Sequence, residues 1–247
     1  QLEDGNLIES VLISDKSRLT LCVSTQVGCA FGCLFCLTGK KGWKRDLVLS
    51  EILNQILAVR ETLKDGSSIT NVVLMGMGEP LANYDNTLKA IELMAHPEAF
   101  KLSSRRIALS TAGLLPELER LSKEKISFSL AISLNASDEE TRSHLMPVNR
   151  RYPLERLLEV CRHFPLRPRT RITFEYVLVG GINDTGQDAR RLLKLLRGIP
   201  SKINLIPLNE APGIPFKRPS DEKVREFQEI LMKGGFTAIV RASKGAE

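Results

Sequence analysis

No run of the sequence approaches the roughly eighteen apolar residues that a membrane helix needs. The opening residues, QLEDGNLIES, contain neither the basic nor the apolar segment of a signal peptide. Internal repeats, low-complexity tracts and Pro/Gly-rich linkers are also missing. These absences predict a soluble, cytoplasmic protein with no membrane partner. They also favour a single domain spanning residues 1–247.

The cysteines are too few and too unevenly placed for a disulfide framework. There are five, an odd number, and no export signal accompanies them, which indicates a reducing compartment. Lys and Arg exceed Asp and Glu by 35 − 29 = 6, and the pI is about 9.1. A basic balance suits a polyanionic partner but does not identify one.

What the sequence does contain is an alternation of strand and helix patterns. Apolar, β-branched runs predict strands at 19–25, 71–75, 106–110, 126–134, 170–178 and 202–208. Helical patterns lie between and after them at 50–63, 85–95, 114–122, 153–163, 184–196 and 221–233, and Ser50 is the expected N-cap of the first. Such alternation predicts an α/β fold with right-handed crossovers, a partial (β/α)6 TIM-like barrel.

Two further strands are expected at the ends of this barrel. Residues 7–13 should pair with the first strand as an N-terminal β-hairpin extension, with its turn near 15–17, and residues 236–242 could add an edge strand. Ligands of parallel sheets sit at the carboxyl ends of the strands, so functional motifs should cluster there.

Three cysteines follow the first strand in a C-x3-C-x2-C loop: Cys29, Cys33 and Cys36. A structural zinc needs a fourth ligand, and the nearest histidine in sequence is His96. Three thiolates can instead hold a [4Fe-4S] cluster and leave one iron open to chelate the amino and carboxylate groups of S-adenosylmethionine (SAM). The alternatives are three buried core cysteines or an incomplete zinc site.

The loop resembles that of the radical SAM superfamily, and six segments together resemble the RlmN/Cfr family of RNA adenine methyltransferases. These segments are STQVGCAFGCLFCLTGKKG, GMGEPLANYDN, LSTAG, SLNA, MPVNRRYP and LIPLN. The resemblance implies a [4Fe-4S] cluster and SAM as cofactors. It also implies methylation of carbon 2 or carbon 8 of an adenosine in 23S rRNA, and for some members in tRNA. Carbon 2 is preferred here as the more widespread activity. An electron donor such as flavodoxin or ferredoxin and a monomeric state are also expected.

The same resemblance assigns the cofactor contacts. Those to SAM are Gly78, Glu79, Ser110, Ser133, Leu134, Asn135 and Asn209. The glycine permits close backbone approach and the carboxylate could accept hydrogen bonds from an ammonium or ribose hydroxyl. Position 135 is often His in related families. Without the family, Ser and Asn at strand ends are more often caps or turn formers.

Two residues are expected to handle protons and release product. Cys22 matches the family's cysteine that resolves a covalent enzyme–RNA intermediate, although an isolated strand cysteine is usually a small hydrophobe. Glu9, placed in the hairpin strand, matches the candidate proton acceptor but alone would be a surface residue. Cys161 is expected in the core.

A basic loop after the cysteines is the predicted RNA contact. It comprises Lys40, Lys41, Trp43, Lys44 and Arg45. Positive charge beside an aromatic plane suits phosphate contact and base stacking. A solvated basic loop is the alternative.

Family members use two SAM molecules, one to methylate a C-terminal cysteine and one cleaved to a 5′-deoxyadenosyl radical. That cysteine is expected a few residues after 241–245, beyond the last residue here, and a small N-terminal accessory domain is also expected outside this chain. Two rival functions remain open at this point: another radical SAM enzyme, and a zinc-dependent RNA-binding module.

Overall fold

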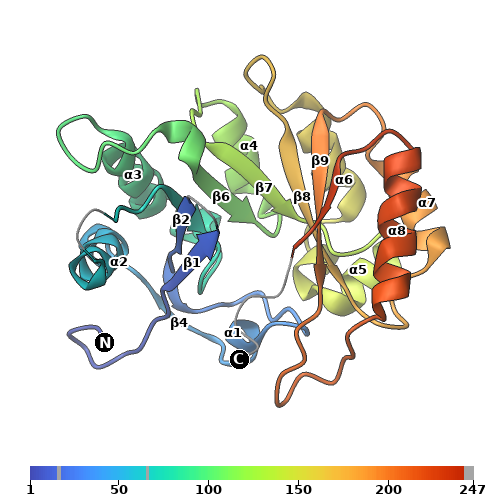
Figure 1. The fold of residues 1–247 in the computed structure, drawn as a ribbon, viewed down its shortest axis with the longest axis horizontal. Helices are drawn as coiled ribbons and strands as arrows, with labels where there is room; N and C mark the ends of the chain where they lie inside the picture. The colour runs from blue at the N-terminus through green and yellow to red at the C-terminus, as the bar shows by residue number, and fades with distance from the viewer. Residues whose placement is uncertain (16–17, 65–66, 242–247) are drawn as a thin grey trace.

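The computed structural model describes residues 1–15, 18–64 and 67–241. Its core is one curved sheet with the strand order β1-β2-β5-β6-β7-β8-β9-β10 (Figure 1). Every neighbouring pair from β2 to β10 is parallel, and β1 is antiparallel to β2. The strands are β1(Val11–Asp15), β2(Arg18–Cys22), β5(Asn71–Leu74), β6(Ile107–Thr111), β7(Ser129–Ser133), β8(Ile172–Leu178), β9(Ser201–Pro207) and β10(Ala238–Val240).

Because β1 and β10 lie at opposite edges of the sheet, the barrel is open. This confirms the α/β fold predicted from the sequence, a partial TIM-like barrel with an N-terminal hairpin extension. The predicted final strand is also present as the edge strand β10. The expected hairpin turn includes residues 16 and 17, which lie outside the described part of the chain.

Helices connect successive parallel strands, as right-handed crossovers require. They are α2(Leu49–Thr62), α3(Tyr84–Ala95), α4(Leu115–Ser122), α5(Glu139–Leu145), α6(Leu154–His163), α7(Gly186–Leu195) and α8(Asp221–Lys233). Figure 1 shows α2 and α3 flanking the β1–β2 side of the sheet, and α7 and α8 flanking the β9 side. The helix α5, the short α1(Leu37–Lys40) and the 3-10 helices η1(Pro80–Asn83), η2(Ser104–Arg106) and η3(Pro147–Arg150) were not predicted, because segments this short carry little periodicity.

The two faces of the sheet have different chemistry. Leu21, Leu109 and Ile132 belong to the hydrophobic core that the strands share with the surrounding helices. Since successive side chains of a strand point to opposite faces, their neighbours Cys22 and Ser110 face the concave side of the half-barrel. That side is therefore lined by small and polar groups and is the surface on which a ligand can lie.

The first predicted strand is shorter than expected. It ends at Cys22, and a separate strand, β3(Gln26–Gly28), pairs with β4(Trp43–Asp46) in an antiparallel ribbon. At the break the side-chain amide of Gln55 hydrogen-bonds the backbone N–H and C=O of Ser24, at 2.8 and 2.9 Å. A side chain thus replaces the strand partner there, and the cysteine loop lies between the two strands of the ribbon instead of directly after β2.

Two placements near the N-terminus also need correction. Ser50 is not the N-cap of α2, because the helix begins at Leu49 and Val48 holds the N-cap position. The N–H of Val48 donates a hydrogen bond to the Glu51 carboxylate at 3.0 Å. Glu9 is not part of the hairpin strand, which begins at Val11. Its carbonyl oxygen accepts a hydrogen bond from the Ser24 hydroxyl at 2.7 Å, and this contact ties the preceding segment to the break after β2.

Candidate active site

The cysteine loop is held by two backbone hydrogen bonds to other segments and by one within the loop. The N–H of Cys29 donates to Gly42 O at 3.0 Å, and the N–H of Leu34 donates to Leu145 O at 3.0 Å. Within the loop, the N–H of Cys36 donates to Cys33 O at 3.1 Å. Cys29, Cys33 and Cys36 are each half-buried, and none of them forms a disulfide within the described structure. The loop therefore presents three thiols from a fixed backbone.

The three thiols act on one another electrostatically. Burial raises the pKa of Cys33 to about 12, and the neighbouring sulfurs of Cys36 and Cys29 add to the shift. Burial likewise raises the pKa of Cys29 to about 11, with further contributions from Glu79 and Cys36. The thiolate forms of these cysteines are unfavourable next to one another, so a cationic metal centre bound to them would stabilise the thiolates.

The donor set fits a cluster better than a single ion. Among the described residues, no three His, Cys, Asp or Glu side chains converge as ligands of one metal ion. A zinc ion with bonds of about 2.3 Å would draw its thiolates to about 4 Å from one another. In an iron–sulfur cubane each thiolate binds a different iron, so the sulfurs stand further apart. Cys29, Cys33 and Cys36 supply the three thiolates that such a cluster takes from a protein when its fourth iron is left without a protein ligand.

Glu79 lies beside this loop at the carboxyl end of β5. It is 3% exposed, and its carboxylate accepts hydrogen bonds from the N–H of Leu81 at 3.1 Å and of Ala112 at 2.8 Å. Burial raises its pKa to about 7, although these backbone donors oppose the shift. Gly78 has a φ of +102°, and a Cβ there would lie 2.6 Å from the Gln26 side chain. The GMGEP turn thus requires a glycine and delivers a buried carboxyl group to the rim.

The next strands bring two hydroxyl groups to the same rim. Ser110 near the end of β6 and Ser133 at the end of β7 have their Oγ atoms 3.5 Å apart. Because the strands are parallel, their carboxyl ends meet at one edge, as the sequence predicted for these residues. The two hydroxyls could share a polar ligand.

The remaining predicted SAM contacts differ in exposure, because two of them are buried and one is exposed. Asn135 is buried with a φ of +58°, and its Oδ1 accepts from the N–H of Val177 at 2.8 Å. Leu134 is fully buried, its N–H donates to Glu175 O, and its carbonyl accepts from Arg142. Both residues help to shape the rim through the contacts they already make. Asn209 is exposed just after β9.

Arg142 of α5 is a functional candidate that sequence reasoning missed. Its side chain is 1% exposed, and it donates to the carbonyls of Ala112, Ser133 and Leu134 at 2.8 to 3.2 Å. Burial lowers its pKa to about 10, and the thiol of Cys33 opposes that shift. The guanidinium thus joins the ends of β6 and β7 and lies in the field of the cysteine loop. No periodicity distinguishes it from a surface arginine of α5.

Cys22 faces the concave side from the end of β2, and burial raises its pKa to about 11, so at neutral pH it is a protonated thiol. Glu9, its predicted companion, is exposed. Cys161 is 1% exposed within the hydrophobic core, which confirms the expectation for it.

A second polar pair on the concave face was also missed. The carboxyl group of Glu175 in β8 accepts a hydrogen bond from Asn204 Nδ2 of β9 at 2.9 Å. Burial raises the pKa of Glu175, and Asn204 Oδ1 is buried without a hydrogen-bond partner in the described structure. The signal in the sequence is a single acid inside an apolar strand, between the core residues Phe174 and Tyr176.

The predicted RNA-contact loop lies along α1 and β4. Lys40, Lys41 and Trp43 are exposed. Lys44 donates to Asn6 Oδ1 at 3.1 Å, whereas Arg45 is ion-paired with Asp4 and Glu51 at 2.7 and 2.8 Å. The basic side chains of this loop are therefore not equally available to bind phosphate. The charge of Arg45 is balanced by two carboxylates, whereas Lys40 and Lys41 are exposed.

Comparison with known proteins gives three kinds of match. The radical SAM superfamily model matches residues 23–196. The dual-specificity RNA methyltransferase RlmN of Syntrophobacter fumaroxidans is 54% identical over the whole chain, which covers 72% of that protein, and the RlmN of Geobacter sulfurreducens is 51% identical, with 67% of its length covered. A crystal structure of a radical SAM methyltransferase from Sphaerobacter thermophilus superposes with a TM-score of 0.94 at 45% identity, over 98% of this chain and 72% of that one.

Spore photoproduct lyase, at 14% identity and a TM-score of 0.63, shares the fold alone. Within the described residues, no helix is both long and apolar enough to cross a membrane.

Proposed function

We propose, from the premise that this chain belongs to the radical SAM superfamily and within it to the RlmN family of RNA methyltransferases, that it methylates carbon 2 of an adenosine in 23S rRNA. A tRNA is the proposed second substrate, in keeping with the dual specificity named for its relatives. The observation that carries the proposal is the convergence of the three-cysteine loop, the buried Glu79 and the paired serines of β6 and β7 at one rim.

Enzymes of this family use a [4Fe-4S] cluster and SAM. In this chain Cys29, Cys33 and Cys36 would hold the cluster, since they are three half-buried thiols on one loop. When bound, the cluster supplies the electron that cleaves SAM reductively. Arg142, buried beside Cys33, would offset part of the negative charge of the thiolates.

The rim residues are proposed to orient SAM. Glu79 can accept a hydrogen bond from an ammonium group, and Gly78 lets the ligand approach the backbone. Ser110 and Ser133 supply hydroxyl groups that can donate to or accept from a ribose. Leu134, Asn135 and Asn209 would complete the pocket, the first two by holding the rim in shape.

Cys22 is proposed to release the methylated base. The group is a thiol at neutral pH. After losing its proton it would attack the sulfur of the family's methyl-carrying cysteine, so that an S–S bond forms while the bond from that sulfur to the transferred carbon breaks and leaves its electron pair on the carbon. Glu9 is proposed to accept the proton that the adenine loses. The loop containing Lys40, Lys41, Trp43, Lys44 and Arg45 is proposed to contact the RNA. Flavodoxin or ferredoxin is the proposed electron donor, and the enzyme is proposed to be monomeric and cytoplasmic, with residues 1–247 forming one domain.

The test is methylation of RNA by the anaerobically reconstituted full-length protein. We expect 2-methyladenosine in a 23S rRNA fragment, detected by mass spectrometry after nuclease digestion, and SAM cleavage that depends on a reductant. 8-Methyladenosine instead would assign the carbon 8 reaction. SAM cleavage without any methylated adenosine would indicate a different radical SAM enzyme, and zinc without iron or sulfide would contradict the enzyme proposal altogether.

A further inference from the structure

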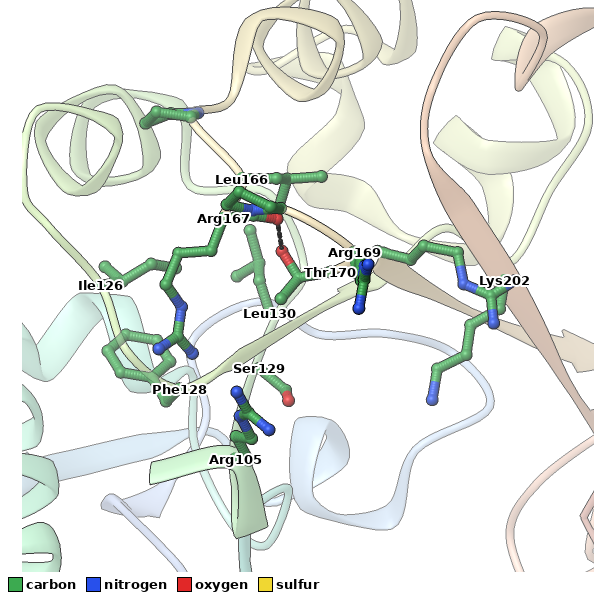
Figure 2. Close-up of a pocket in the computed structure, with 13 residues that line it drawn as sticks. Arg105, Ile126, Phe128, Ser129, Leu130, Leu166, Arg167, Arg169, Thr170 and Lys202 are labelled. Atoms are coloured by element: carbon green, nitrogen blue, oxygen red, sulfur yellow. Dashed lines mark hydrogen bonds between the residues drawn. The ribbon is translucent and has the colours of Figure 1, made fainter. Parts of the chain in front are cut away.

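A cavity of about 600 Å³ opens at the end of the barrel opposite to the cysteine loop (Figure 2). Its walls come from the segments that lead into β6, β7, β8 and β9, so it lies at the amino-terminal ends of these strands. The polar side chains that line it include Arg105, Ser129, Arg167, Arg169, Arg171 and Lys202. None of the residues assigned to SAM, the cluster or RNA above belongs to this cavity.

The lining is cationic and carries no carboxylate. Within the described part of the chain, none of its four arginines or Lys202 forms an ion pair, whereas Arg45 and Arg191 each contact two carboxylates. Arg167 donates to the carbonyl of Ser127, and Arg171 donates to Thr237 Oγ1 at 3.1 Å. Figure 2 shows Arg105 and Arg167 on the side of the cavity where Phe128 lies, and Lys202 on the other side.

Holding these like charges together in a concave space is unfavourable without a counterion. Burial lowers the pKa of Lys202, and the guanidinium groups of Arg241 and Arg171 lower it further. The carboxylate of Glu175 acts in the opposite direction and raises this pKa. Arg169 adopts a φ of +65°, in the left-handed region that side chains rarely occupy. A bound anion would relieve the repulsion, and arginines match the geometry of phosphate oxygens.

Two lining residues of the cavity, Ser129 and Lys202, face the same side of the sheet as the proposed reactive groups. Ser129 pairs in register with Ala108, Ala108 with Val73, and Val73 with Cys22. Three strand spacings separate Ser129 from Cys22, about 15 Å across the sheet. Lys202 likewise pairs in register with Thr173, Thr173 with Ala131, and Ala131 with Ser110. The cationic cavity thus borders the surface that leads to the proposed reactive groups.

We propose that this cavity binds phosphates of the RNA substrate, so that the adenosine enters the concave face from the amino-terminal end of the barrel. The inference rests on the proposed function and adds to it a docking site and a direction of entry. RNA is favoured over an acidic electron-donor protein because a donor bound here would be separated from the cysteine loop by the length of the barrel.

The test compares two double variants of equal charge. Arg105→Gln with Arg169→Gln removes two cavity cations. Arg190→Gln with Arg225→Gln removes two exposed arginines of the outer helices α7 and α8 as the matched control. Binding of a fluorescein-labelled 23S rRNA hairpin to the full chain is measured by anisotropy over a range of salt concentrations, and reductive SAM cleavage without RNA reports on folding and cluster loading.

We expect the cavity variant to weaken RNA binding about tenfold or more and to lower the slope of log Kd against log salt by one to two. The control variant should match the wild type within about twofold, and both should cleave SAM at the wild-type rate.

Equal affinities and slopes for the two variants would overturn this proposal alone. It would also be overturned if RNA binding were unchanged while reduction by flavodoxin slowed, because that result would assign the cavity to the electron donor. Failure of the wild-type chain to bind RNA at all would overturn both this proposal and the proposed function.

Discussion

At the scale of single residues, the fold shifts the pKa of the Glu79 carboxyl group, and this shift can be tested. The two backbone donors to this group compensate only part of the hydration lost on burial, and its pKa rises from 4.5 to about 7. The folded protein without cofactors therefore binds a proton at pH values where the same group in the unfolded chain is ionised. Glu79 could lose this proton when an ammonium group binds beside it.

This shift predicts a pH dependence of stability. Below pH 4.5 the group is protonated in both states, so its contribution is fully present. That contribution is lost as the pH rises to about 7, on the order of 3 kcal/mol, because the folded state holds the extra proton. The variant Glu79→Gln lacks this titration. In urea denaturation of the cofactor-free protein, we expect the wild type to lose stability relative to Glu79→Gln between pH 5 and 8. Parallel profiles would contradict the assignment.

At the scale of elements, the β3–β4 ribbon decides where the cysteine loop lies. Gly28 ends β3 with a φ of +80°, and a Cβ at this position would lie 1.8 Å from Gly42 O. The same carbonyl oxygen accepts the hydrogen bond from the N–H of Cys29. The ribbon can therefore close over the loop only if residue 28 has no side chain.

Two glycine variants separate this contact from simple backbone strain. Gly28→Ala should displace the Gly42 backbone and lose most of the iron and sulfide taken up on anaerobic reconstitution. Gly42→Ala has a similar φ of +71° but nothing within 4 Å of the added Cβ, so it should incur only strain of about 1 to 2 kcal/mol and load normally. Iron and sulfide per chain are the measurements. Equal loading of the two variants would show that the close approach does not position the loop.

At the scale of the whole molecule, the cluster should stabilise the barrel. A group that binds only the folded chain adds to the free energy of unfolding, and three thiols of the unfolded chain do not form its site. We expect anaerobic reconstitution to raise Tm by several degrees, since about 1 kcal/mol corresponds to 2–4 °C in a chain of this size. Cys33→Ala should remove both the brown chromophore and the rise in Tm. A retained chromophore would contradict Cys33 as a ligand.

Most strands and helices could be predicted from the pattern of neighbouring residues. Element ends that depend on contacts between residues far apart in the sequence could not be predicted in this way. The strands that form the parallel sheet followed from runs of β-branched residues, and α8 was predicted with its observed bounds. The end of β2 at Cys22 depends instead on Gln55, whose side chain reaches Ser24 across 31 positions. The start of α2 depends on Glu51, which is held by Arg45 of the preceding strand. Neither contact has a local signal.

The sequence by itself determined the barrel class and the three-thiol loop, because hydrophobic periodicity and close spacing are properties of neighbouring residues. Only the tertiary structure decided which polar groups lie together. Arg142 meets the carbonyls of two strand ends, and Glu175 meets Asn204, because parallel strands place residues far apart in the chain at one level of the sheet. The cationic cavity has the same origin, since four separate segments contribute its walls and their charges accumulate only once the strands are in register.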